Sequence, residues 1–151
     1  MMNTLYDYQK EVAAILAADP WINTHEVAII AENSLDLETE IQAALESTGI
    51  LATVNTPAVK GIGEYAGQIV GEIEALTIVV AETVAINRQR PNGCTALDAG
   101  VRIAGLLHSD TCTFLSLEQA VDEQQATITC TVRLATSINV SLTASTLPEG
   151  N

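Results

Sequence analysis

Aromatic and basic side chains are both scarce in this chain. Only 3% of its 151 residues are aromatic, whereas 48% are hydrophobic, so the core must be built from Ala, Val, Ile and Leu. Such small and branched side chains suit the close packing of helices against a sheet. Six basic residues stand against 19 acidic ones, which gives a formal charge of −13. This balance argues against ordinary binding to the phosphate backbone of nucleic acids, which requires clustered Lys and Arg.

Long apolar runs are also lacking. No uninterrupted run approaches the roughly 18 residues that a membrane-spanning helix needs. The first residues, MMNTLYDYQKEV, lack the basic region and apolar core of a signal peptide. The acidic residues are spread along the chain and form no run long enough for a disordered acidic tail. We therefore expect neither a signal peptide nor contact with a membrane.

Cysteine and histidine are too few and too dispersed for a metal centre. Cys94, Cys112 and Cys130 are an odd number with wide gaps that fit no zinc motif. We expect them to be buried free thiols in preference to a disulfide. His25 lies between an expected helix end and a strand, and His108 lies at an expected helix C-terminus. Capping or surface roles are therefore predicted for both.

Three sequence patterns could indicate an enzyme. Cys94 precedes a helix, whose N-terminus could lower the pKa of a thiol. Glu72 and Glu74 share a strand face and could act in hydrolysis or bind a divalent ion, although pairs arise by chance among 19 acids. Gly61-Ile-Gly63 followed by Gly67 is loosely similar to a phosphate loop but lacks its Lys-Ser/Thr end. We expect no catalytic, cofactor or metal site, and a protein that is not an enzyme.

Strict alternation is clearest over residues 126–136, ATITCTVRLAT. One face would carry Ala126, Ile128, Cys130, Val132 and Leu134, and the other Thr127, Thr129, Thr131 and Arg133. This period of two predicts a strand with one buried and one wetted side. We interpret its threonine-rich face, which holds no catalytic group, as a surface for packing against another subunit.

The remaining periodicities predict an α+β fold, with two to three helices packed on a mixed, mainly antiparallel sheet. Helices are expected over 5–16, 36–47 and 95–107, and strands over 27–31, 50–54, 74–88, 112–117, 127–136 and 138–144. Capping boxes at Thr4–Asp7 and Thr95–Asp98 begin two of the helices. The glycine-rich stretch 58–72 is predicted to be a mobile loop with a short strand around 68–70. We expect a single domain over 1–147 and a polar tail over 148–151.

Glu82 falls on the apolar face of the long strand 74–88, where an unpaired charge would be costly. Two explanations are open. Either the strand turns over at a bulge at Ala81–Glu82, or its far half leaves the core and Glu82 faces a partner subunit or solvent. In the second case, the arginines would pair with acids across the interface. These arginines are Arg88, Arg90, Arg102 and Arg133.

The segments EALTIVVAETVAINR, CTALDAGVRIAGLLHSD and QATITCTVRLAT follow one another as strand, buried helix and alternating strand. In this order they resemble the tail terminator proteins of long-tailed phages, and the related tail-completion and minor tail proteins of prophages. TLYDYQKEVAAILAADPWI and VAIIAEN extend the resemblance to most of the chain. The helix 36–47 and the glycine-rich stretch depart from the shortest terminators.

The resemblance implies a structural virion protein of a phage or prophage tail, assembled in the bacterial cytoplasm and free of cofactors. Such proteins form a ring, typically hexameric, that caps the tail tube and joins it to the head connector. DNA passes through without specific binding, and an acidic lumen would repel it. The candidate subunit-interface residues are Glu82, Arg88, Arg90, Arg133, Gly61 and Gly63.

Two other functions are compatible with the composition. An acidic module, such as a DNA mimic, could inhibit a nucleic-acid-binding protein, although mimics display dense exposed acids and these acids are diluted among apolar strands. A hydrolase that uses Glu72 and Glu74 is the third hypothesis.

Overall fold

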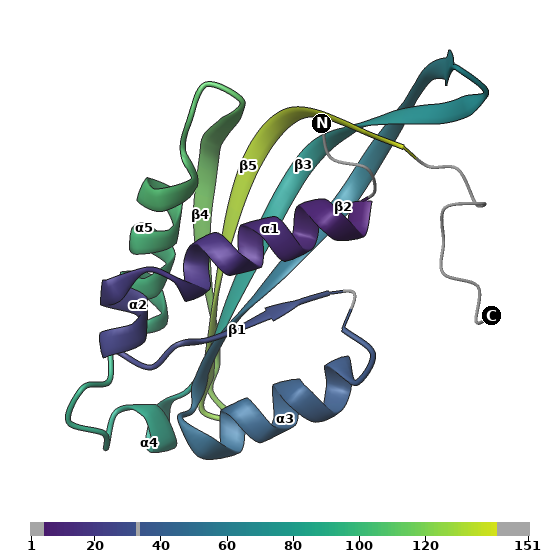
Figure 1. The fold of residues 1–151 in the computed structure, drawn as a ribbon. Coiled ribbons are helices and arrows are strands. Elements are labelled where there is room, and N and C mark those ends of the chain that lie inside the picture. The colour runs from purple at the N-terminus through teal and green to yellow at the C-terminus, as the bar shows by residue number, and fades with distance from the viewer. Residues whose placement is uncertain (1–4, 33, 142–151) are drawn as a thin grey trace.

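The computed structural model describes residues 5–32 and 34–141 as helices on a five-stranded sheet (Figure 1). The elements in chain order are α1 (Leu5–Ala17), α2 (Pro20–Thr24), β1 (Ala28–Ala31), α3 (Leu37–Ser47), β2 (Ile50–Tyr65), β3 (Gln68–Thr83), α4 (Val84–Asn87), α5 (Ala96–Leu107), β4 (Cys112–Asp122) and β5 (Thr127–Ser141). The sheet order is β1-β2-β3-β5-β4, in which only the β1–β2 pair is parallel. The predicted α+β class with a mixed, mainly antiparallel sheet is confirmed.

One face of the sheet forms the main core with α1 and α5. Ile78 and Val80 on β3, together with Cys130, Val132 and Leu134 on β5, are completely buried on this face. The predicted alternation along β5 is therefore confirmed. Gly100 brings α5 so close to β5 that an added Cβ would lie 2.6 Å from the Cys130 sulfur.

The opposite face is covered at one end by α3. Leu51 and Ile30 point away from the main core and are nevertheless buried, and α3 contacts the two strands that carry them. On β3, β5 and β4 the same face carries half-buried or exposed residues, among them Thr129 and Thr131. The threonine-rich face lies here, and its role in packing against another subunit stays a prediction.

Helix ends follow the expected chemistry where they are described. Thr95 accepts a hydrogen bond from the Asp98 amide at 3.0 Å and Asp98 accepts one from the Thr95 amide at 3.2 Å, so the second capping box is confirmed. Asp19 ends the first helical run as predicted. The same residue also caps the short helix α2, which Pro20 begins and the periodicity did not indicate. Thr4, and with it the first predicted capping box, lies outside the described residues.

The prediction of a loop over 58–72 was wrong, although the short strand expected around 68–70 is part of β3. β2 and β3 run through this stretch as a two-stranded hairpin whose turn is Ala66–Gly67, with φ values of 52° and 81°. β2 also passes Pro57, where the prediction ended a strand. Proline is tolerated there because β1 pairs only as far as Val54, so Pro57 lies at a free edge with a register shift.

Two further boundaries differ from the prediction. β3 ends at Thr83, and residues 84–87 form the helical turn α4 where the long strand was expected to continue to Arg88. β5 is continuous through 127–141, where two strands were expected. The expected end of the last strand, the domain limit at residue 147 and the tail over 148–151 lie outside the described residues.

Candidate assembly surface

The end of the β2–β3 hairpin, residues 58–72, projects from the body of the domain (Figure 1). We call this segment the arm. β5 accompanies it only as far as the Val70–Ser141 pair, so within the described part of the chain the tip beyond Val70 has no neighbouring strand. The tip is therefore a ribbon of two strands that depends on its body for stability.

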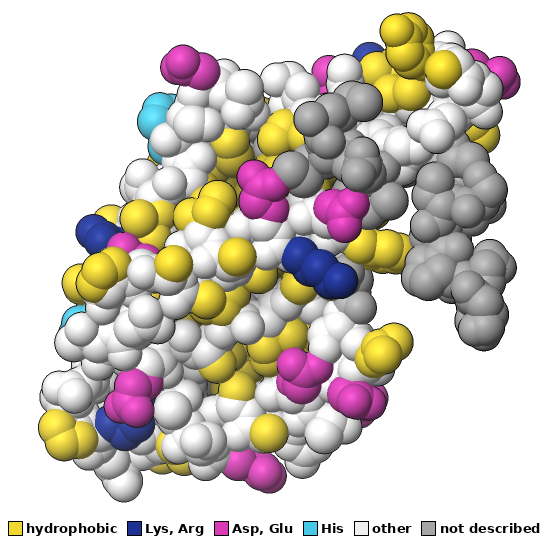
Figure 2. All heavy atoms as spheres, in the orientation of Figure 1, with side chains coloured by type: hydrophobic (Ala, Val, Ile, Leu, Met, Phe, Trp, Pro, Cys, Tyr) yellow, Lys and Arg dark blue, Asp and Glu magenta, His cyan; other side chains and the backbone are white. Residues whose placement is uncertain are grey.

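Large apolar side chains are exposed on the arm. Tyr65 is 76% exposed, Ile69 53% and Ile62 48%. Figure 2 shows hydrophobic atoms gathered at this end of the molecule. Isolated exposed apolar residues are common on protein surfaces, but a cluster on a protruding hairpin is typical of a protein interaction site.

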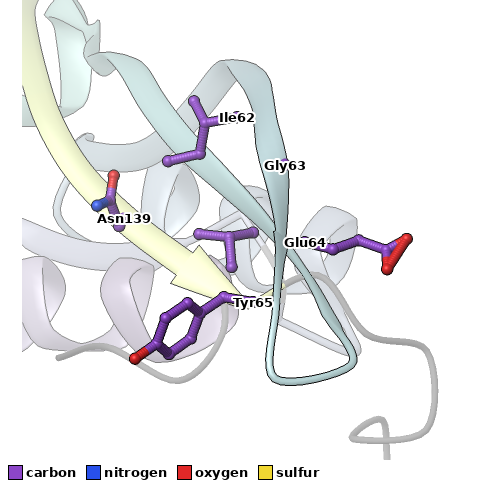
Figure 3. Close-up of a pocket in the computed structure, with 6 residues that line it drawn as sticks. Ile62, Gly63, Glu64, Tyr65 and Asn139 are labelled. Atoms are coloured by element: carbon purple, nitrogen blue, oxygen red, sulfur yellow. The ribbon is translucent and has the colours of Figure 1, made fainter.

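The arm has two chemically different sides. Ile62, Gly63, Tyr65, Val70 and Asn139 line a hollow of about 350 Å³, whose rim Glu64 completes. In Figure 3 the Ile62 and Tyr65 side chains lie on the side of Asn139, whereas the carboxylate of Glu64 points away from them.

The arm contains two of the predicted interface residues, Gly61 and Gly63. An added Cβ at either position would have no atom within 4 Å, so packing within the chain does not require these glycines. Gly63 has a φ of +130°, a conformation that an L side chain rarely adopts, and it follows a register shift.

Glu82 lies inside the domain, and the structure agrees with neither explanation offered for it. β3 stays in regular register with β2 and β5 from Ala81 to Thr83, and the Glu82 side chain is completely buried. Its carboxylate accepts hydrogen bonds from Arg88 Nε at 2.8 Å, Asn87 Nδ2 at 2.7 Å and the Ala96 amide at 3.0 Å. Glu82 thus ties the end of β3 to α4 and to the start of α5.

Burial alone would raise the pKa of Glu82. The hydrogen bonds from Arg88, Asn87 and the Ala96 amide outweigh this effect and hold the pKa below its usual value. The carboxylate is therefore ionised at neutral pH, and sequence pattern could not reveal this because its donors come from the turn that follows the strand.

The other predicted arginines also pair within their own chain. Arg90, 15% exposed, donates to Asn87 Oδ1 at 2.7 Å, to the His25 carbonyl at 3.0 Å and to Glu26 at 3.1 Å. Arg133 pairs with Glu118 at 2.6 Å on the open face of the sheet, where both side chains are at least half exposed. Of the predicted interface residues, only Gly61 and Gly63 lie on the arm.

The structure places the candidate catalytic groups at two separate positions, with Cys94 before α5 and Glu72 and Glu74 on β3. Burial raises the pKa of the Cys94 thiol to about 11, the opposite of an activated nucleophile. All three cysteines are buried and free, as predicted. Glu72 lies opposite Lys60, while Glu74 sits at a register shift. No group of three or more potential metal ligands occurs among the residues that the structure describes.

Both histidines lie at the C-cap positions of helices, one of the two roles predicted for them. His25 follows α2 and its Nδ1 lies 2.7 Å from the Asn92 carbonyl oxygen. His108 follows α5 and its Nδ1 accepts a hydrogen bond from the Phe114 amide at 3.1 Å.

Sequence reasoning missed a second surface, a groove between α1 and α3. Its margins include Tyr6 and Leu35, which are 45% and 100% exposed. Leu35 is an apolar residue among polar helix-capping candidates, and this contrast was the one available signal. The groove itself requires three elements to meet and is not visible in any single periodicity.

Comparison with known proteins gives a match of structure and none of sequence. The sequence matches no protein-family model and no curated protein. Among solved structures, the chain is similar to a chain of the virion of a native gene transfer agent particle, with a TM-score of 0.52 and 12% identity. The match covers 85% of this chain and 91% of that chain. The protein therefore shares its fold with a chain of a virion particle.

Proposed function

We propose that this protein is a structural component of a phage or phage-like particle and has no catalytic activity. The observation that carries the proposal is the fold shared with a chain of a gene transfer agent virion, which extends over most of both chains. The exposed apolar arm supports an assembling protein, because such a cluster is stabilised when a partner covers it.

More specifically, we propose a tail terminator or tail-completion protein. Copies of the chain form a ring, which we expect to be a hexamer, on the end of the tail tube. The ring stops tube growth and offers a surface to the head connector. The order of strand, buried helix and alternating strand supports this role through its resemblance to tail terminators.

The charge of the chain supports a conduit through which DNA passes without specific binding. All four arginines are engaged in ion pairs, and the formal charge is −13. An acidic lumen would let phosphates slide past, whereas exposed basic residues would hold them. We propose assembly in the bacterial cytoplasm and residence in the finished tail. Among the described residues, no helix combines the length and apolar character needed to cross a bilayer.

The proposal is tested by assembling the protein with tail tube protein from the same phage or prophage. We expect electron microscopy to show a ring at one end of each tube, and tubes of limited length when the protein is added during growth. Tubes that neither bind the protein nor change in length would contradict the terminator role. Selective capture of a nuclease or repressor in place of tail proteins would favour the DNA-mimic alternative.

A further inference from the structure

The groove between α1 and α3 has the shape of a site for an added strand. It encloses about 670 Å³, and Figure 2 shows hydrophobic atoms in the hollow between the two helices. Ile29 and Ile30 both line it. Adjacent residues of a strand point to opposite faces, so a groove that reaches both must open along the edge of β1.

This edge of β1 is the end of the sheet. Within the described residues, β1 pairs with β2 alone, so its edge is open to another strand as far as Ala31, whose carbonyl accepts a hydrogen bond from the Ser34 amide at 3.0 Å. β1 is short, and α1 and α3 flank it, which restricts access to a narrow element. The groove therefore suits a slender β-ribbon with apolar side chains.

Charge at the rim limits the occupant further. Lys10 and Glu40 both line the groove. Glu40 accepts a hydrogen bond from the Ser34 hydroxyl, whereas Lys10 makes no ion pair with a described residue. The other lysine of the chain, Lys60 on the arm, likewise makes no ion pair with a described residue. An acidic side chain on the incoming ribbon would complement Lys10.

The arm of the same protein has each of these properties. It is a narrow two-stranded ribbon, it exposes Ile62, Tyr65 and Ile69, and it carries Glu64, which forms no ion pair with a described residue. It is continuous with the sheet and points away from its own body (Figure 1).

We propose that the arm of each subunit binds in the α1–α3 groove of the next copy, with Glu64 beside the neighbour's Lys10. The two surfaces differ, so the contact is head-to-tail and closes into a ring where its rotation allows. The inference rests on the proposed function for the existence of the ring, and it deepens that function by naming the two contacting surfaces.

Disulfide trapping between differently tagged chains tests the pairing of surfaces. Tyr65→Cys on the arm is mixed with Leu35→Cys in the groove under mild oxidation, in the presence of tail tube. The native thiols are buried and do not compete. We expect a mixed-tag dimer at least fivefold above that of either variant alone.

The matched control pairs Tyr65→Cys with Leu115→Cys, a 61% exposed residue on β4 outside the groove. We expect little product from this pair. Equal or greater trapping at residue 115, preferential trapping of two Tyr65→Cys chains, or no trapping at all would overturn the inference.

Charge reversal provides an independent test that leaves the apolar contact in place. Glu64→Lys and Lys10→Glu each bring like charges together, so we expect each to weaken self-association about tenfold. The double variant restores the pair with its signs exchanged and should recover most of the affinity. Two single variants that associate like the wild type, or a double variant weaker than both, would contradict the contact.

The two hypotheses fail in different ways. Rings on the tail tube without trapping between residues 65 and 35 would refute the arm–groove contact and leave the proposed function intact. Trapping between these residues, with no binding to tube, would support the contact and refute the terminator role.

Discussion

The two ends of the β2–β3 hairpin are built from the same strands but differ in burial and in their contacts. At the base, Glu82 is completely buried, and each of its contacts lies within the chain. At the tip, Tyr65 is 76% exposed and no strand flanks the described ribbon. The base is therefore part of the folded core, whereas the tip has the exposed apolar surface expected of an interface without a bound partner.

This difference teaches that charge and exposure must be judged with tertiary partners in view. From sequence, Glu82 resembled an interface residue because it was a charge on an apolar face. In the fold, an ion pair with Arg88 and two further hydrogen bonds satisfy the buried carboxylate, so it requires no partner subunit. The interface character belongs to the glycine-rich stretch, where exposed apolar side chains have no such compensation within the chain.

The largest effect on stability is expected at the base. Glu82→Gln keeps the side-chain volume but removes the charge that Arg88 and the buried Asn87 amide satisfy. We expect a loss of about 3 kcal/mol in the free energy of unfolding, measured by urea denaturation. Glu118→Gln, which removes an exposed partner of Arg133, is the matched control and should cost less than about 1 kcal/mol. Equal losses in the two variants would show that the burial of Glu82 does not increase its contribution to the free energy of unfolding.

A pair of glycine substitutions compares body and tip. Gly100→Ala places a Cβ 2.6 Å from the Cys130 sulfur, so overpacking should destabilise the fold by about 2 kcal/mol. Gly61→Ala on the arm meets nothing within 4 Å and should change stability by less than about 0.5 kcal/mol. Thermal unfolding of both variants measures the contrast. A larger loss for Gly61→Ala would mean that the arm takes part in the folding core.

Acidification should reduce the stability that Glu82 contributes at the base of the hairpin. The folded-state pKa of Glu82 is lowered, so its stabilising contribution is full above the unfolded-state value of about 4 and is lost as pH falls through the folded value. The stability difference between the wild type and Glu82→Gln should therefore be greatest near pH 7 and shrink below about pH 4. Denaturation curves at several pH values give this difference directly. A gap that widens on acidification would contradict the assignment of a lowered pKa.

Much of the fold follows from local pattern, and the exceptions have identifiable causes. The alternation in β5 and the capping box of α5 each depend on residues close in sequence, so both were predictable. α4 was missed because Val84 and Ile86 favour a strand and continue the alternation of β3. In the fold, a turn that brings Arg88 and Asn87 back to Glu82 overrides this preference.

The arm was missed for a different reason. Gly61, Gly63 and Gly67 weaken every local indication of a strand, yet pairing of residues 58–65 with 68–75 forms one. Of the candidate interface, sequence identified Gly61 and Gly63 but not Tyr65. The groove could not be predicted, because Tyr6, Ile30 and Leu35 meet only when α1, β1 and the turn before α3 come together.

The central claim, that the arm is an assembly surface and the base is not, is tested most directly by the double variant Ile62→Ser/Tyr65→Ser. Its free energy of unfolding and its assembly on tail tube are measured side by side. Leu115→Ser/Val121→Ser, which alters two exposed apolar residues on β4, is the control. We predict wild-type stability within about 0.5 kcal/mol and loss of ring formation for the arm variant alone. A destabilised arm variant that still forms rings would contradict the claim.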